Sequence, residues 1–241
     1  MPRRPRLTLP EVTLHVLQRG NNGGPCFFDE DDYQTYLDWL QTYALETGCA
    51  VHAYALMATR IHLLLTPPTA TAAAKMMKHL SQRYVQHVNA ARDRRGTLWE
   101  GRFRSCMVAG PYYVLACQRY IELSPVRSGA VDHPAEYHWS SYRANASGEP
   151  STLLTPHPAY GALGADTETR LAGYRELFHE PLDPELVEQI RCAVNGNYVL
   201  APPGFQADLG RSLAQPVTPG KPGRPRKSRL PESGAAAPGE V

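Results

Sequence analysis

The stretch Ala55-Leu56-Met57-Ala58-Thr59-Arg60-Ile61-His62-Leu63-Leu64-Leu65-Thr66 predicts a β-strand, because it is a run of apolar and β-branched residues whose second half fits the two-residue period of a strand. Period two places Arg60, His62 and Leu64 on one face of that strand and the intervening apolar residues on the other. Pro67-Pro68 ends it, since proline cannot extend a β-ladder. The face with Arg60 and His62 is therefore either exposed to solvent or part of a site where these two polar side chains contact a ligand.

The composition suits a packed protein. The chain has 241 residues, 42% of them hydrophobic, which is enough for one substantial domain and an appendage. We find no run long enough to span a membrane and no apolar segment behind the basic start, so we expect neither a membrane protein nor an exported one. The five cysteines are scattered without zinc-type spacing, as expected of buried thiols in a reducing cytosol.

Basic residues gather in one part of the chain. Between residues 75 and 104 the acidic residues are only Asp93 and Glu100. The basic ones there are Lys75, Lys78, Arg83, Arg92, Arg94, Arg95, Arg102 and Arg104. A polyanion is the expected partner. Aromatic residues interleaved with arginines over residues 97–105 suit stacking on bases and pairing with phosphates, although a solvated face and a core tryptophan would leave the same pattern.

The order of elements predicts a mixed fold. The expected strands cover residues 12–17, 49–56 and 55–66 and a stretch ending at 108, and the expected helices cover 29–47, a stretch from 71 to 88, and 112–123. The last of these helices carries Tyr113, Cys117, Tyr120 and Ser124 on one face, and spacing alone indicates a packing stripe. Residues 150–200 look helical, and from about 215 the composition cannot bury a core.

Several motifs, in order, make the chain resemble a known family. They are Arg19-Gly20-Asn21-Asn22, Ala55-Leu56-Met57, His62-Leu63-Leu64-Leu65-Thr66-Pro67, Leu98-Trp99-Glu100-Gly101-Arg102-Phe103-Arg104-Ser105, Arg119-Tyr120-Ile121-Glu122-Leu123, Pro125-Val126-Arg127 and Trp139-Ser140-Ser141-Tyr142. With them the chain resembles the REP-associated tyrosine transposases, which belong to the HUH single-strand DNA nuclease superfamily and are related to single-tyrosine insertion-sequence transposases.

This resemblance implies an α+β fold, ferredoxin-like or RRM-like, in which helices pack on one face of an antiparallel sheet. The expected divisions are a transposase-like domain over 1–145, a helical C-terminal extension over 146–212, and a disordered basic tail over 213–241.

The resemblance also implies a chemistry. In this family a tyrosine attacks a DNA phosphodiester and forms a 5′-phosphotyrosine, with Mg²⁺ or Mn²⁺ held by a His-hydrophobic-His motif and a residue four positions after the tyrosine. Tyr120 matches the nucleophile and His62 the second histidine. The expected partner is hairpin-forming single-stranded DNA, bound by a monomer or a homodimer that is cytoplasmic and associated with the nucleoid.

Two positions depart from the family pattern. Arg60 stands where the first histidine is expected, and Ser124 stands at the third-ligand position. Arginine has only donors and cannot bind a cation, while serine is at best a weak ligand. Either the protein is a catalytically impaired relative that keeps its DNA surface, which we favour, or Arg60 clamps the scissile phosphate in place of the metal.

The rival interpretations are a non-catalytic DNA-binding or regulatory protein derived from this fold, and an RRM-like RNA-binding module. The residues expected to contact phosphate or DNA are Arg60, Arg19, Arg83, Trp99, Arg102, Arg104, Arg224, Arg226 and Lys227. The last three lie in Lys221-Pro222-Gly223-Arg224-Pro225-Arg226-Lys227, which resembles an AT-hook for the minor groove of A·T-rich duplex DNA and reads equally as a solubilising tail.

Overall fold

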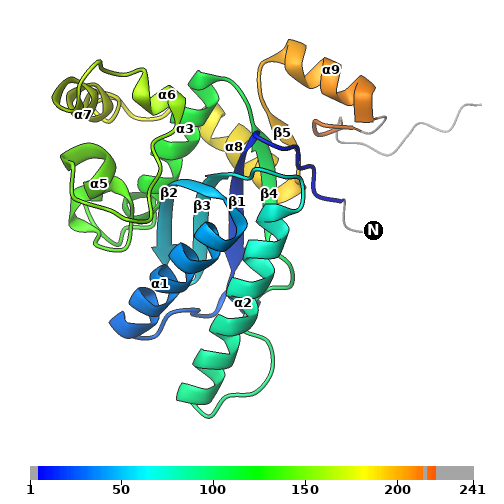
Figure 1. Ribbon diagram of the computed structural model, residues 1–241, viewed down its shortest axis with the longest axis vertical. Helices are drawn as coiled ribbons and strands as arrows, with labels where there is room; N and C mark the ends of the chain where they lie inside the picture. Colours follow the sequence, from blue (N-terminus) through cyan, green and yellow to red (C-terminus); the bar gives the residue numbers. More distant parts are fainter. Residues whose placement is uncertain (1–4, 214–215, 221–241) are drawn as a thin grey trace, which may run out of the picture.

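A five-stranded sheet forms the centre of the computed structural model, which describes residues 5–213 and 216–220 (Figure 1). The strand order is β2-β3-β1-β4-β5. The strands are β1 (Thr13–Arg19), β2 (Ala50–Met57), β3 (Arg60–Thr66), β4 (Arg104–Val108) and β5 (Val199–Leu200). All neighbours run antiparallel except β4 and β5, which are parallel. The predicted α+β class is therefore confirmed, with β5 making the sheet mixed.

Helices occupy the connections and most of the chain after the fourth strand. They are α1 (Glu30–Thr47), α2 (Ala72–Ala91), α3 (Pro111–Glu122), α4 (Ser124–Arg127), α5 (Tyr142–Ser147), α6 (Pro158–Gly161), α7 (Thr167–Glu176), α8 (Pro184–Gly196) and α9 (Pro203–Leu213). Two 3₁₀ turns add η1 (Asn21–Gly23) and η2 (Pro134–Glu136). The predicted end of α1 is confirmed, because Gly48 takes the left-handed conformation (φ 69°) that glycine adopts without strain.

The stretch from 55 to 66 is two strands rather than one. Its first three residues end β2, the chain reverses at Ala58-Thr59, and β3 begins at Arg60, which pairs with Met57. A tight reversal between two apolar runs leaves little trace in their hydropathy, which explains the error. The alternation within β3 is confirmed, because Ile61 packs into one core cluster and Leu64 into another.

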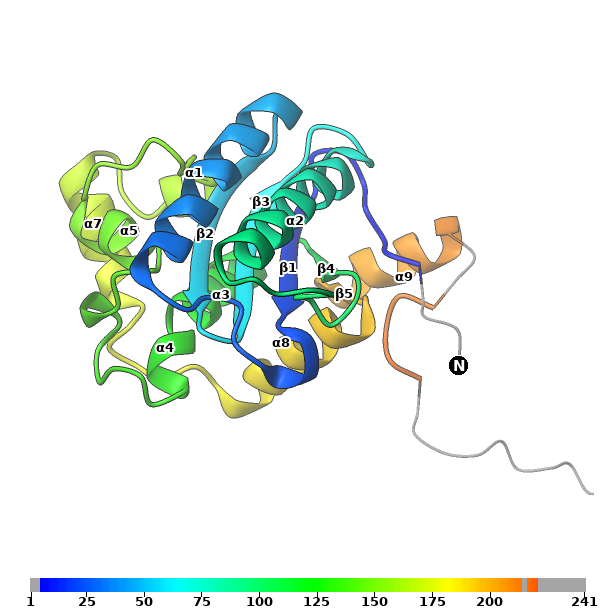
Figure 2. The ribbon, with the colours of Figure 1, turned by 90° about the horizontal axis from the view of Figure 1, so that it is seen from below.

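Helices cover both faces of the sheet, not one as predicted. Figure 2 shows α1 and α2 on one side and α3, α4 and α8 on the other. The second face needs a cover because it is apolar too, with Ala53, Ala55, Leu64 and Cys106 buried there against α3 and α8. The sheet is therefore the middle layer of three.

Residues after α4 protect the edge of β2. The amide of Leu56 donates to the carbonyl of Trp139 (2.9 Å) and the amide of Thr155 donates to that of Val51 (2.7 Å). These bonds occupy an edge that would otherwise be open to pairing. Within the described ranges no helix is long and apolar enough to cross a membrane.

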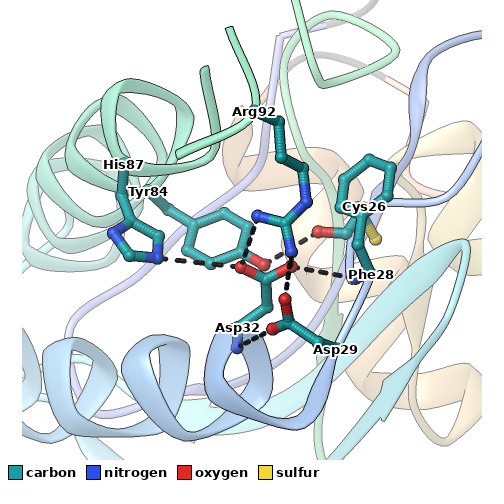
Figure 3. Close-up of polar contacts among 7 residues, drawn as sticks. All are labelled: Cys26, Phe28, Asp29, Asp32, Tyr84, His87 and Arg92. Carbon is teal, nitrogen blue, oxygen red and sulfur yellow. Dashed lines mark hydrogen bonds and ion pairs between the residues drawn. The ribbon is translucent and has the colours of Figure 1, made fainter. Parts of the chain in front are cut away.

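An ion-pair cluster joins the start of α1 to the end of α2 (Figure 3). Asp32 is buried, and its carboxylate accepts one hydrogen bond from the guanidinium of Arg92 (3.2 Å) and one from the amide of Phe28 (2.9 Å). Its second oxygen forms an ion pair with Arg92 at 2.9 Å. Arg92 also pairs with Asp29, the N-cap of α1, and His87 lies 3.7 Å from Asp32. This cluster, the Asp32 clamp, balances its positive charge with carboxylates.

Candidate functional site

Tyr120 stands over the second face of the sheet, on α3. Its ring centroid lies 5.7 Å from that of His15 on β1 and 5.9 Å from that of His62 on β3, with interplanar angles of 64° and 83°. The phenol side chain is largely buried, at 6% exposure, and it lines a cavity with His62. The structure therefore brings the predicted nucleophile and the predicted histidine together.

His15 is the partner of His62 that the sequence analysis missed. Its Nε2 lies 2.9 Å from the Nδ1 of His62, and both rings are buried. Burial lowers the pKa of His15 to about 3, with the charge of Arg127 acting in the same direction. Burial, then His15 and nearby arginines, also holds the pKa of His62 well below its ordinary value. Both imidazoles are therefore neutral near pH 7.

A sequence signal for His15 existed. It alternates with Leu14 and Val16, so strand periodicity placed it on the face opposite those two core residues. What the pattern could not supply was the register, in which β1 lies beside β3 with His15 opposite Leu64.

The cavity beside Tyr120 has a volume of about 190 Å³ and a strongly basic lining. It is lined by Met57, Arg60, His62, Tyr120, Ser124, Arg127, Ser128, Val187 and Arg191. The three arginines come from β3, α4 and α8, and no carboxylate is part of the lining. Arg191 has one acidic neighbour outside it, Glu188, at 3.6 Å on the exposed side of α8.

Arg127 holds the nucleophile candidate in place. Its guanidinium carbon lies 3.9 Å from the centroid of the Tyr120 ring, a cation–π distance. The Nη2 atom of Arg127 donates hydrogen bonds to the backbone carbonyl of Tyr120 (2.6 Å) and to the hydroxyl of Ser124 (2.8 Å). Burial lowers the pKa of Arg127, and the charges of Arg191 and Arg60 act in the same direction.

Glu122, a buried residue at the end of α3 and two positions after Tyr120, anchors this helix. Glu122 accepts hydrogen bonds from Ser141 (2.5 Å), Asn145 (2.8 Å) and Tyr174 (2.7 Å). Burial raises its pKa to about 7, and the three donors oppose the shift. These bonds tie α3 to α5 and α7, so residues beyond 145 help to fix its position.

The residues of this cavity do not fit a divalent cation. Arg60 occupies the expected first-ligand position and offers only donors. Ser124 donates its hydroxyl hydrogen to the carbonyl of Tyr120 (3.0 Å) and accepts from Arg127, so its oxygen is already engaged. Among the described residues there is no group of three histidine, cysteine or acidic side chains that could hold a metal ion. The weak ligand role predicted for Ser124 thus has no support in its hydrogen bonding.

Other residues predicted to contact DNA lie apart from the cavity lining, at different places in the fold. Arg19 and Arg104 both donate to the amide oxygen of Asn195 on α8 (2.9 and 3.0 Å), near the end of β1. Trp99 is buried and stacks on Tyr84 of α2, which is a packing position. The structure therefore places the Trp99 ring in the core, with an edge lining the two cavities on the α2 side.

Arg102 and Arg83 line two other cavities, of about 400 and 710 Å³, on the α2 side. They are not brought to Tyr120. Arg224, Arg226 and Lys227, with the rest of the AT-hook-like segment, lie outside the described residues.

Sequence comparison identifies the region that carries this cavity. Residues 8–124 match the family described as "Transposase IS200 like". This part of the chain belongs to the IS200-like transposase family. The matched region ends at Ser124, so the transposase-family region contributes Tyr120, both histidines and Arg60, whereas Arg127 and Arg191 come from beyond it. No curated protein matches the chain.

One solved structure supports the same fold. A structure described as a REP-associated tyrosine transposase bound to a REP hairpin is similar with a TM-score of 0.51 and 13% identity, over 65% of this chain and 93% of that chain. A putative transposase from Deinococcus radiodurans R1 is similar with a TM-score of 0.35 and 20% identity, over 50% of this chain and 96% of that chain. The first likeness confirms the fold of the transposase-family region, and the second is too low to add to it.

Proposed function

We propose that this protein binds hairpin-forming single-stranded DNA through the face that carries Tyr120, and that it is a transposase-type protein with impaired strand cleavage. The observation that carries the proposal is the cavity itself. A tyrosine in the position of the family nucleophile lies beside a histidine pair and among three arginines, where a metal site is expected.

DNA binding is supported by charge and by family. Guanidinium groups bind phosphate oxygens with charge-assisted hydrogen bonds, and the cavity offers three of them without a lining carboxylate. The family assignment makes DNA the expected polyanion, and the similar solved structure is described as a complex with a REP hairpin. Arg19 and Arg104 extend the positive charge along the end of β1.

Impaired cleavage is supported by the chemistry of the cavity. In the ancestral reaction the Tyr120 oxygen would attack phosphorus, forming a tyrosine–phosphate ester and releasing a 3′-hydroxyl. A bound Mg²⁺ or Mn²⁺ would act as a Lewis acid on the phosphate. Only His62 remains of the predicted ligand set, so this chain lacks the groups that would hold the ion. The alternative is a non-catalytic DNA-binding or regulatory protein, which differs only in having no residual cleavage.

A paired assay tests the proposal. Hairpin-forming single strands, unstructured single strands and duplexes of the same length are compared for affinity, and the hairpin is then incubated with Mg²⁺ or Mn²⁺ to look for a covalent protein–DNA adduct. We expect preferential hairpin binding and little or no adduct. Efficient adduct formation that disappears in Tyr120→Phe would disprove impairment, and equal affinity for all three DNAs would disprove hairpin recognition.

Restoring the family ligands offers a second test. The double variant Arg60→His, Ser124→Asn supplies the missing ligand types, so we expect it to increase Mn²⁺-dependent adduct formation relative to the parent. Ser124 is bonded to Arg127 on α4, so the single Ser124→Asn variant serves as the control for disruption of that contact. No gain in the double variant, with the fold intact, would show that more than the ligands has been lost.

We also propose that the division of the chain at about 145 and 212 separates a DNA-processing domain, a helical extension and a basic tail. Because Val217 is buried and its carbonyl accepts from the amide of Val199, only residues 221–241 should be deleted to test the tail. If the tail binds duplex DNA, its deletion will flatten the dependence of duplex affinity on salt concentration.

Sedimentation of the full chain distinguishes monomer from homodimer, and imaging of a tagged chain tests the proposed cytoplasmic, nucleoid-associated location.

A further inference from the structure

The histidine pair decides what the cavity can bind. The two neutral rings share one hydrogen between His15 Nε2 and His62 Nδ1. The remaining nitrogen of His15, Nδ1, is buried without a hydrogen-bond partner among the described residues. The remaining nitrogen of His62, Nε2, belongs to a ring that lines the cavity.

Two hydrogen placements are available to this pair. If His62 donates from Nδ1, then His15 carries its hydrogen on Nδ1, where it is a buried N–H donor with no acceptor. If His15 donates from Nε2, its Nδ1 is a bare lone pair, and His62 carries its hydrogen on Nε2. Among buried backbone groups, N–H donors without an acceptor are rarer than acceptors with an unused lone pair. We apply the same preference to the imidazole nitrogens, which favours the second placement. It makes His62 a hydrogen-bond donor toward the cavity.

The three arginines of the cavity are donors as well. Arg60, Arg127 and Arg191 are cations with N–H groups only. The hydroxyl hydrogens of Ser124 and Ser128 are directed to the backbone carbonyls of Tyr120 and Pro125. Positive groups therefore meet here without a lining carboxylate, in contrast to the Asp32 clamp.

We propose that the cavity beside Tyr120 is a metal-independent phosphate site, in which the guanidinium groups of Arg60, Arg127 and Arg191 and the Nε2–H of His62 hold one backbone phosphate of a single strand. This assignment rests on the proposed DNA binding and replaces the divalent cation expected of the family. A metal ion is bound by side-chain atoms with free lone pairs, whereas a phosphate oxygen is bound by hydrogen-bond donors. The cavity supplies donors.

Phosphate binding is tested with inorganic phosphate as the probe, in EDTA, on the full chain. Long-range ¹H–¹⁵N spectra of the histidine rings report the tautomers of His15 and His62. We expect the Nε2–H form for both, and movement of the His62 signals as phosphate is added. Arg60→Gln should weaken phosphate binding about tenfold, while Arg211→Gln, an exposed arginine on α9 outside the cavity, should leave it unchanged.

Metal dependence is tested on the same sample. Mn²⁺ at substoichiometric amounts broadens signals of nuclei near its site, so we expect the His62 signals to stay sharp. Hairpin affinity should be equal in EDTA and in Mg²⁺. Arg60→Gln and Arg191→Gln should each lower the slope of log affinity against log salt by about 0.7, the value for one single-strand phosphate contact.

The inference is wrong if His62 is in the Nδ1–H form, if Mn²⁺ broadens its signals, or if Arg60→Gln leaves phosphate affinity unchanged. These outcomes are distinct from failure of the proposed function. Phosphate bound in the cavity by a protein with no affinity for hairpin DNA would remove the proposed function. Hairpin affinity that is lost in EDTA would keep the proposed function and remove the metal-free site.

Discussion

The Asp32 clamp and the cavity beside Tyr120 lie on opposite faces of one sheet, and both contain arginine. In the clamp, Arg92 meets two carboxylates, Asp32 and Asp29, and the charges are balanced within the chain. In the cavity, Arg60, Arg127 and Arg191 meet one another across a lining that contains no carboxylate. The clamp joins two helices. In the cavity, no lining carboxylate neutralises the positive charge of the three guanidinium groups.

The difference indicates how to separate a structural cluster from a binding site when both are built from the same residue types. A buried charge whose partner lies in the same chain contributes to folding, and removing that partner destabilises the protein. A cluster of like charges held together by the fold costs folding free energy until an anion binds. Stability and ligand affinity should therefore respond in opposite ways at the two places.

Removing the carboxylate of the clamp should have the largest effect on folding. Asp32→Ala leaves Arg92 with one partner and the Phe28 amide with none, so we expect a loss of about 3–5 kcal/mol in the free energy of unfolding. Urea denaturation measures it. Asp31→Ala is the matched control, because Asp31 is exposed in the same helical turn and should cost only about 0.5 kcal/mol. Equal losses in the two variants would show that the clamp contributes nothing beyond the helix dipole.

Glu122 is a buried carboxyl group whose hydrogen-bond donors are all neutral. It should therefore make the free energy of unfolding depend on pH. Its pKa is about 7 in the folded protein and 4.5 ordinarily, so the folded state binds the extra proton between these values. The stability it contributes is present below pH 4.5 and is lost as the pH rises to 7. Glu122→Gln cannot ionise, so its stability relative to the parent should rise across this window, by on the order of 2–3 kcal/mol.

The comparison with the parent is essential because other groups titrate in the opposite direction. Burial lowers the pKa of His15 to about 3 and that of His52 to about 4, so each adds stability as the pH rises toward its ordinary value of 6.5. Denaturation of the parent and of Glu122→Gln at several pH values isolates the carboxylate. A difference that does not vary between pH 4.5 and 7 would show that the Glu122 carboxyl is not perturbed.

Arg60→Gln should have the smallest effect on stability. Arg60 is exposed at the start of β3 and its charge acts on Arg127 unfavourably, so we expect a change within about 0.5 kcal/mol, or a gain. The same urea denaturation measures it. A loss above about 1 kcal/mol would place Arg60 in a structural network like that of Arg92 and would remove the contrast between the two clusters.

Local patterns predicted most of the elements because their causes are local. The carboxylates at 29–32, the apolar stripe behind them and Gly48 define α1, and the alternation in β3 separates Ile61 from His62. Local patterns failed where distant segments cooperate. β5 is only two residues long, and the apolar stripe that predicts a helix over α8 does not reveal that this helix covers the second face of the sheet.

The sequence by itself determined the family of residues 8–124, the helix that carries Tyr120, and the loss of a histidine at position 60. These are properties of side-chain identity and spacing. Only the tertiary structure decided that His15 meets His62, that Ser124 is engaged by Arg127, and that Arg191 from α8 faces the same cavity. The physical reason is that register and helix docking set these distances through the packing of segments far apart in the chain, and no local pattern records them.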